Sequence, residues 1–188
     1  MSFGKACLRE FNRYWIGRSF FAGDDNYELE MQLWRDAMNR PESRRAPALA
    51  HGELESFLRT EFPQVFNAGS GLSVEEIWHG GAQVRQAYQE DFIRPGGTIS
   101  GPTMMAHADF AMYVAVLASI GPVPLAVTTN LSINFLRKPS AADLLAKARL
   151  MKLGKRLAVG EVAIRSVGAV ELVAHATSTY SIPRPQDA

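Results

Sequence analysis

One long apolar segment, residues 101–120, restricts the folds that this chain can adopt. Apart from His107 and Asp109, almost every residue of this segment is apolar or small. Pro102 suits the first turn of a helix, where its missing N–H costs nothing, and a Gly-Pro pair directly after residue 120 ends the helix. A helix that is apolar on all sides is buried on all sides. We therefore expect a central helix that the rest of the domain surrounds.

The carboxylate of Asp109, near the middle of this helix, needs a reason to be there. Burying a charge is unfavourable unless the charge is paired or put to use. Asp109 is therefore either a structural group that caps a neighbouring backbone or a functional one. His107 lies two residues away and so on another face of the helix, and we expect it to pack in the core or in an interface.

Composition excludes several classes of protein. With 188 residues the chain can form one domain with a proper core. Its net charge of +1 argues against nucleic acid as the main partner. The single cysteine, Cys7, rules out an intramolecular disulfide framework and fits a reducing compartment, so we expect a cytoplasmic protein. The apolar helix is too short and too close to strand-like sequence for a good membrane span. Neither Cys7 nor the other histidines have metal-ligand spacing.

Regular alternation of apolar residues predicts strands on both sides of the central helix. Runs over 72–78 and 82–88 flank paired glycines and suggest a hairpin. On the strand that follows the helix, we expect Leu131 on the apolar face and Thr128 on the opposite, polar face. The expected elements are a helix over 53–62 and further strands over 123–135, 144–150, 157–164 and 170–182. Consecutive hairpins imply an antiparallel sheet, so the fold class is α+β, with a curled sheet around one helix.

The first 46 residues differ from the rest. Aromatic and arginine residues crowd the start of the chain, residues 27–38 have helical spacing, and residues 40–47 read as a linker. We interpret residues 1–46 as an N-terminal extension, helical or disordered, and residues 47–188 as the main domain.

The order of elements and three motifs resemble the hotdog-fold acyl-CoA thioesterases of the phenylacetate-pathway and 4-hydroxybenzoyl-CoA type. The motifs are Gly97-Thr98-Ile99-Ser100-Gly101-Pro102 with Ala108-Asp109-Phe110-Ala111, the strand 127–137, and the turn 153–159. The resemblance implies hydrolysis of an acyl-CoA to a free acid and coenzyme A, without a metal or other cofactor. It also implies a homodimer or homotetramer with active sites between subunits, and the open edges of a single curled sheet favour such pairing.

The resemblance gives four residues a role in catalysis. Asp109 would be the general base or nucleophile, the N–H of Gly101 would polarise the thioester carbonyl, and Thr128 of the partner subunit would help to position water. A helix N-terminus has free N–H groups and a partial positive charge. Gly101 and Asp109 are about 12 Å apart along the axis, and a thioester lying along the helix could reach both. Ser100 stands where the family usually has histidine, Pro102 where it has glycine, and Arg94 where it often has asparagine. Ser100 can still donate a hydrogen bond.

Basic residues gather on the strands and turns of the C-terminal third of the chain. They either form a solvated face or contact the phosphates of coenzyme A; the candidates for such contacts are Arg137, Lys138, Lys155 and Arg156. The acyl pocket should depend on Phe110, Met105, Tyr113 and the partner's residues. The string His79-Gly80-Gly81 lies between two predicted strands, and we give it no catalytic role.

Two other functions compete with hydrolysis. A non-catalytic acyl-CoA binding or sensing module would keep the pocket and lose turnover; Asp109 argues against it, and the lost histidine before Gly101 argues for it. A hotdog dehydratase or hydratase needs a histidine paired with the carboxylate. The positions where we expect that histidine hold Phe92, Ile93 and Arg94, so this function ranks lowest.

Overall fold

A computed structural model describes residues 45–183 of the chain. Residues 1–44, which make up nearly all of the expected N-terminal extension and include its predicted helix, lie outside the described residues, as do residues 184–188. The helical segments are α3 (His51–Glu61), the short 3-10 helix η1 (Glu90–Phe92) and α4 (Gly101–Ile120). The strands are β1 (Leu72–Trp78), β2 (Gly81–Gln86), β3 (Ile93–Arg94), β4 (Thr98–Ile99), β5 (Val127–Phe135), β6 (Leu144–Leu153), β7 (Leu157–Ser166) and β8 (Ala174–Ser181).

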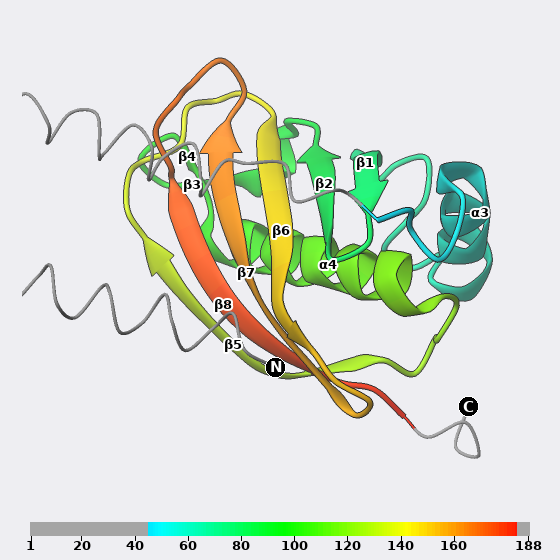
Figure 1. Cartoon of the computed structure of the whole chain (residues 1–188). Helices are drawn as coiled ribbons and strands as arrows, with labels where there is room; N and C mark the ends of the chain where they lie inside the picture. The colour runs from blue at the N-terminus through cyan, green and yellow to red at the C-terminus, as the bar shows by residue number, and fades with distance from the viewer. Residues whose placement is uncertain (1–44, 184–188) are drawn as a thin grey trace, which may run out of the picture. The chain divides into compact units, whose positions relative to one another are not determined.

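Six of these strands form one antiparallel sheet in the order β1-β2-β6-β7-β8-β5, and α4 lies against its concave face (Figure 1). This is the curled sheet around one helix that the hotdog resemblance predicts. The expectation of consecutive hairpins is wrong at one point, because β5 pairs with β8 and not with β6. After α4 the chain therefore enters at the sheet edge and crosses back to β6, which leaves β5 with one free edge.

The central helix α4 has the predicted bounds, with a cap at each end. The hydroxyl of Ser100 accepts a hydrogen bond from the N–H of Thr103, and Pro102 occupies the first turn. At the other end Gly121 has φ 92°, a conformation that glycine adopts without a steric penalty. By length and composition α4 could cross a membrane, but 72% of its apolar window is buried inside the domain. It is the core helix of this domain, as its sequence predicts.

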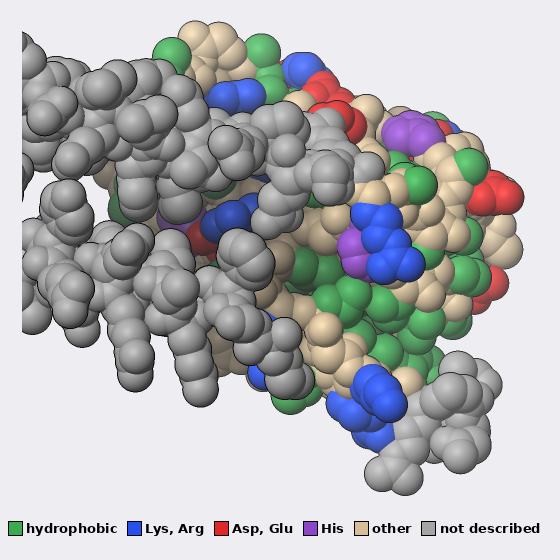
Figure 2. All heavy atoms as spheres, in the orientation of Figure 1, with side chains coloured by type: hydrophobic (Ala, Val, Ile, Leu, Met, Phe, Trp, Pro, Cys, Tyr) green, Lys and Arg blue, Asp and Glu red, His purple; other side chains and the backbone are tan. Residues whose placement is uncertain are grey.

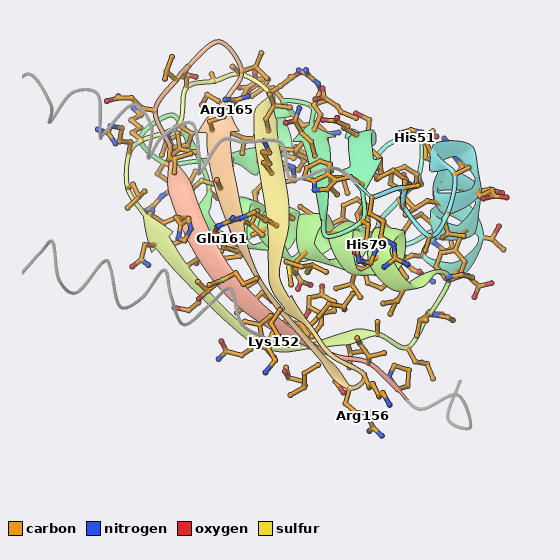
Figure 3. The ribbon with its side chains drawn as sticks, viewed as in Figure 1. His51, His79, Lys152, Arg156, Glu161 and Arg165 are labelled. Atoms are coloured by element: carbon orange, nitrogen blue, oxygen red, sulfur yellow. The ribbon has the colours of Figure 1, made fainter. Side chains whose placement is uncertain are left out.

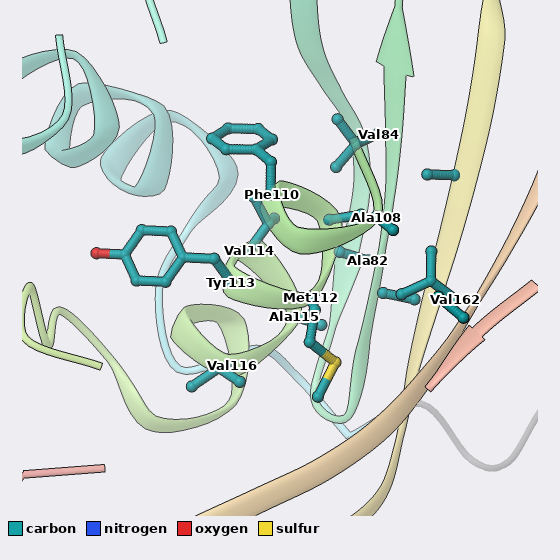
Figure 4. Close-up of a cluster of buried hydrophobic side chains, with 14 of the residues drawn as sticks. Ala82, Val84, Ala108, Phe110, Met112, Tyr113, Val114, Ala115, Val116 and Val162 are labelled. Atoms are coloured by element: carbon teal, nitrogen blue, oxygen red, sulfur yellow. The ribbon is translucent and has the colours of Figure 1, made fainter. Parts of the chain in front are cut away.

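Small residues let α4 approach the sheet closely. A Cβ atom on Gly160 of β7 would lie 2.7 Å from a carbonyl oxygen of β6 and 2.7 Å from the Met112 side chain, so only glycine fits there. Figure 4 shows the side of α4 that faces the sheet and, on another side, the rings of Phe110 and Tyr113 pointing away from the sheet. The contact between helix and sheet is rich in alanine, from Ala108, Ala111 and Ala115 on the helix to Ala82, Ala146, Ala148, Ala174 and Ala176 on the strands.

Strand β5 contains a bulge that the sequence pattern did not predict. Its register with β8 shifts between Thr128 and Asn130. Thr128 is opposite Tyr180, and Leu131 is opposite Ser178. Since Tyr180 and Ser178 are both buried on the inner face of the sheet, Thr128 lies on the same inner face as Leu131. The prediction that placed these two residues on opposite faces is wrong, because the extra residue of a bulge breaks the alternation.

Candidate active site

Asp109 projects from the middle of α4 toward the ends of β5 and β8. Thr128 of β5 donates a hydrogen bond to Oδ1 of Asp109. The hydroxyl of Tyr180, on β8, lies 2.8 Å from the same Oδ1 and 2.8 Å from the backbone oxygen of Asp109. Among residues 45–183, no donor contacts Oδ2. One carboxylate oxygen is therefore held by two hydroxyl groups, and the other remains available.

Tyr180 is 2% exposed and fixes the position of Asp109. Burial, followed by the negative charge of Asp109, raises the pKa of Tyr180 well above its usual range. The phenol therefore keeps its proton at physiological pH and remains a donor. Because its oxygen contacts both the side chain and the backbone of Asp109, it restricts the rotation of the carboxylate as well as stabilising its charge.

A cavity of about 370 Å³ opens beside this carboxylate. It runs between α4, the segment after α3 and the start of β5, and most of its lining is apolar. Phe110 and Tyr113 line it as expected; Met105 does not line it and is 40% exposed. The lining residues are Glu61, Phe62, Val65, Ala106, Asp109, Phe110, Tyr113, Pro124, Ala126, Val127, Thr128 and Tyr180. An apolar pocket with a few polar groups at one place is typical of a small-molecule site.

Thr128 contacts Asp109 within one chain. The bulge in β5 accounts for this contact, because it turns Thr128 from the outer to the inner face of the sheet. The resemblance implies a Thr128 supplied by the partner subunit, and that supply stays a prediction.

The N-terminus of α4 lies outside the cavity, since neither Ser100 nor Gly101 lines it. Ser100 caps the helix and also shares a 2.9 Å hydrogen bond with the hydroxyl of Thr103. Gly101 donates its N–H to no acceptor among residues 45–183, and the Phe135 ring covers it so closely that a Cβ atom would lie 3.1 Å away. The helix therefore has a free donor, about 12 Å along the axis from Asp109.

The basic residues predicted to bind coenzyme A form two separate groups. Lys155 and Arg156 lie at the tip of the β6–β7 hairpin, where Figure 3 labels Arg156 and Figure 2 shows a cluster of basic side chains. The backbone of Arg156 accepts a hydrogen bond from Ile182, directly after β8, so this tip lies at the Tyr180 end of the sheet. Arg137 and Lys138 follow the opposite end of β5, where Arg137 pairs with Glu171 and Lys138 donates to the carbonyl of Gly96. A strand of 9 residues, about 30 Å long, separates the two groups.

The histidines have structural positions. His107 is 1% exposed, and its Nε2–H donates to the carbonyl of Val84 at 3.1 Å, as expected for core packing. Burial lowers the pKa of His107 to about 4, so the ring is neutral at pH 7. His79 belongs to the β1–β2 turn, which Ser119 ties to the far end of α4. Among residues 45–183, no group of three histidine, aspartate or glutamate side chains could hold a metal ion.

Two site residues were missed by sequence reasoning. The one signal that the sequence offers for Tyr180 is its hydroxyl, since a buried tyrosine usually needs a polar partner. Glu61 carries no local signal, because an acidic residue at the exposed end of a helix is ordinary.

Comparison with known proteins identifies the family of the chain. The sequence profile described as "Thioesterase superfamily" matches residues 96–172. A solved structure from Silicibacter sp. TM1040, named "putative thioesterase", is 44% identical, with 73% of this chain and 94% of that chain covered and a TM-score of 0.67. The phenylacetic acid degradation protein PaaI from Thermus thermophilus, solved in a mutant form, is 31% identical over 60% of this chain and 94% of that chain, with a TM-score of 0.54.

A curated protein of Saccharolobus solfataricus, named "putative esterase", is 28% identical over 138 residues, which are 73% of this chain and 89% of that protein. The sheet order, the position of α4 and the extent of the first structural match all agree with the resemblance found in the sequence. The chain therefore belongs to the thioesterase superfamily.

Proposed function

We propose that this protein hydrolyses acyl-CoA thioesters, with Asp109 as the general base or nucleophile. The observation that carries the proposal is the carboxylate itself: Oδ1 is held by Thr128 and Tyr180, while Oδ2 is free beside an apolar cavity. A fixed and charged carboxylate at the wall of such a pocket can take a proton from water or attack a carbonyl directly.

The chemistry needs no group beyond this carboxylate, a water molecule and a donor for the carbonyl oxygen. In the general-base route, Asp109 takes a proton from water as the water oxygen bonds to the thioester carbon. The carbon–sulfur bond then breaks, and the thiolate of coenzyme A leaves and takes up a proton. In the nucleophilic route, Oδ2 bonds to the thioester carbon, the carbon–sulfur bond breaks and the thiolate of coenzyme A leaves and takes up a proton. Water then hydrolyses the resulting anhydride, which releases the acid and restores the carboxylate of Asp109. Both routes give a carboxylic acid and coenzyme A.

A donor for the carbonyl oxygen must lie near Asp109, and the same chain does not provide Gly101 there. The donor lies about 3 Å from the carbonyl oxygen, and the attacking group lies about 3–3.5 Å from the carbonyl carbon. The donor and the attacking group can therefore be at most roughly 7 Å apart. Gly101 and Asp109 are about 12 Å apart along α4. The side chain of Asp109 points back toward Gly101 but shortens this separation only in part. The expectation that one helix supplies both groups to one thioester does not fit this geometry.

We propose that a second copy of the chain supplies the missing donor through the free edge of β5. Antiparallel pairing of two β5 strands would place the Phe135 end of one beside the Thr128 end of the other. Because the Phe135 ring lies on Gly101, the partner's Gly101 would approach Asp109. The apolar side chains exposed on this side of the domain support the pairing: Met105 is 40%, Val127 52%, Phe135 50% and Leu136 50% exposed.

The same pairing would reunite the two groups of basic residues. Arg137 and Lys138 follow the Phe135 end of β5, and Arg156 lies at the opposite end of the sheet, beside Ile182. In a two-fold pair, the partner's Arg137 and Lys138 would therefore lie near Lys155 and Arg156 of the first chain. We propose that this combined cluster contacts the phosphates of coenzyme A.

Release of free thiol from a panel of short-chain, long-chain and aryl acyl-CoAs tests the proposed reaction. Asp109→Asn should lower kcat by about 100-fold or more, while Asp91→Asn, an exposed carboxylate in η1, should leave it unchanged. Equal turnover by wild type and Asp109→Asn would reject Asp109 as the catalytic group. No turnover at all, with acyl-CoAs still raising the melting temperature, would support a binding module instead.

A further inference from the structure

A second carboxylate, that of Glu61, lines the cavity that holds Asp109. Glu61 is the last residue of α3, and its side chain accepts no hydrogen bond from residues 45–183. Tyr113 lies one helical turn beyond Asp109, about 6 Å further along α4, and the charge of Glu61 acts on its hydroxyl. Glu61 therefore lies on the Tyr113 side of the cavity, a helical turn along α4 from Asp109.

The polar atoms at this end are nearly all acceptors. The hydroxyl of Tyr113 already donates its proton to the carbonyl of Pro124, at 3.4 Å. Burial, and then the negative charge of Glu61, raise the pKa of Tyr113, so the phenol stays protonated and uncharged. The carbonyl of Pro124 and the carboxylate of Glu61 have no protons to give. From the described residues that line this end, a ligand group can therefore find acceptors for its hydrogen bonds but no free donor for its own acceptors.

The middle of the cavity is apolar. Phe62, Val65, Phe110 and Ala126 line the cavity together with the two carboxylates, and the Phe62 and Tyr113 rings pack edge to face at 5.9 Å. An acyl group with its carbonyl at Asp109 would lay an apolar body along these side chains and bring its far end to Glu61 (Figure 4 shows the direction of Tyr113).

We infer that Glu61 determines substrate specificity: it favours acyl groups whose far end donates a hydrogen bond, as a hydroxyl or ammonium group does, and rejects those that end in a carboxylate. The inference rests on the proposed thioester hydrolysis, which orients the acyl group. A donor at the far end would pair with an unpartnered carboxylate. A carboxylate there would be repelled by the charge of Glu61 and would find no donor, so binding of such a substrate is disfavoured.

Four coenzyme A thioesters of equal length test this inference: ω-hydroxyhexanoyl, ω-aminohexanoyl, heptanoyl and ω-carboxypentanoyl. Each is also made as a non-hydrolysable thioether for calorimetric measurement of Kd. In the wild type, the hydroxyl or ammonium tip should raise kcat/KM and tighten binding about tenfold relative to heptanoyl. The carboxylate tip should weaken both by a similar factor. The hydroxyl and ammonium compounds show whether a neutral donor suffices or a positive charge is needed.

Substitutions of Glu61 separate its charge from the shape of the cavity. Glu61→Leu should remove the preference for donor tips, and Glu61→Lys should reverse it in favour of the carboxylate tip. Glu55→Gln, on the same helix but outside the cavity lining, should keep the wild-type order. Because Glu61 is exposed at a helix end, these variants are expected to fold.

The two readouts distinguish failure of this inference from failure of the proposed function. Turnover of all four thioesters with the same preference in wild type and Glu61→Leu would overturn the role of Glu61 and leave hydrolysis intact. Binding of the thioethers in the predicted order without turnover would reject hydrolysis and retain Glu61 as the selecting group. Absence of both binding and turnover would reject both.

Discussion

A heterodimer of two inactive variants tests whether the active site joins two subunits. Asp109→Asn removes the base, and Gly101→Pro removes the only N–H that Gly101 offers. Proline fits the first turn of a helix, and Ser100 before it already has an extended conformation with ψ 151° that proline accepts. The exposed Phe135 ring, 3.1 Å from an added Cβ, has to shift slightly. Each homodimer should lose activity, by about 100-fold or more for Asp109→Asn and about 100-fold to 1000-fold for Gly101→Pro.

The mixed dimer gives a quantitative expectation. If the base of one chain works with the donor of the other, one site of the heterodimer has both groups intact and the other site has neither. A heterodimer isolated through two different tags should then retain about half of the wild-type kcat. This follows from the separation of about 12 Å between Gly101 and Asp109 along α4, which is too long for one thioester carbonyl to bridge.

The assay is thiol release from the best substrate of the panel, with a tagged heterodimer of wild type and Asp109→Asn as the calibration for one intact site. Activity of the doubly mutated pair no higher than that of either parent would refute the shared site, since it would mean that both groups must belong to one chain or that Gly101 has no role. Failure of the two tags to purify together would refute the dimer itself.

Three further variants test single elements of the structure. Tyr180→Phe should lower kcat about tenfold with little change in KM, because it frees the rotation of Asp109 without altering the cavity wall; an unchanged kcat would show that Thr128 alone holds the carboxylate. Burial lowers the pKa of His107 to about 4, so the folded state favours the neutral ring. The resulting contribution to the free energy of unfolding is about 3 kcal/mol; it is present above about pH 6.5 and is lost as the pH falls to about 4. Denaturant unfolding at several pH values should show this loss of stability, and His107→Gln should remove the pH dependence. Gly160→Ala should lower the free energy of unfolding, measured with denaturant, by about 1–3 kcal/mol, because its Cβ would lie 2.7 Å from a β6 carbonyl oxygen. As a control, Gly52→Ala on the open face of α3 should raise the free energy of unfolding by up to about 1 kcal/mol.

The main elements could be predicted because their signals are local. The apolar residues of 101–120 and the flanking Ser100, Pro102 and Gly121 define α4 without reference to any other part of the chain. Alternation along the strands predicts which residues face the helix, and the position of Asp109 inside an apolar helix marks it as unusual. These signals depend on helix and strand periods that the backbone fixes for any sequence.

The environment of Asp109 could not be predicted in this way, because it depends on pairing between distant segments. The bulge in β5 decides that Thr128 faces inward, and alternation alone predicts the opposite. Tyr180 reaches Asp109 across 71 residues of sequence, so no short pattern links them.

The apolar helix, the fold class and the candidate carboxylate thus follow from residue type and spacing along the chain, where neighbouring residues share one backbone geometry. The tertiary structure decided which hydroxyls hold that carboxylate and that Glu61 shares its cavity, while neither Ser100 nor Gly101 lines it. Each of these depends on strand register and on the packing of separate elements. A shift of one residue in register turns a side chain to the other face of the sheet.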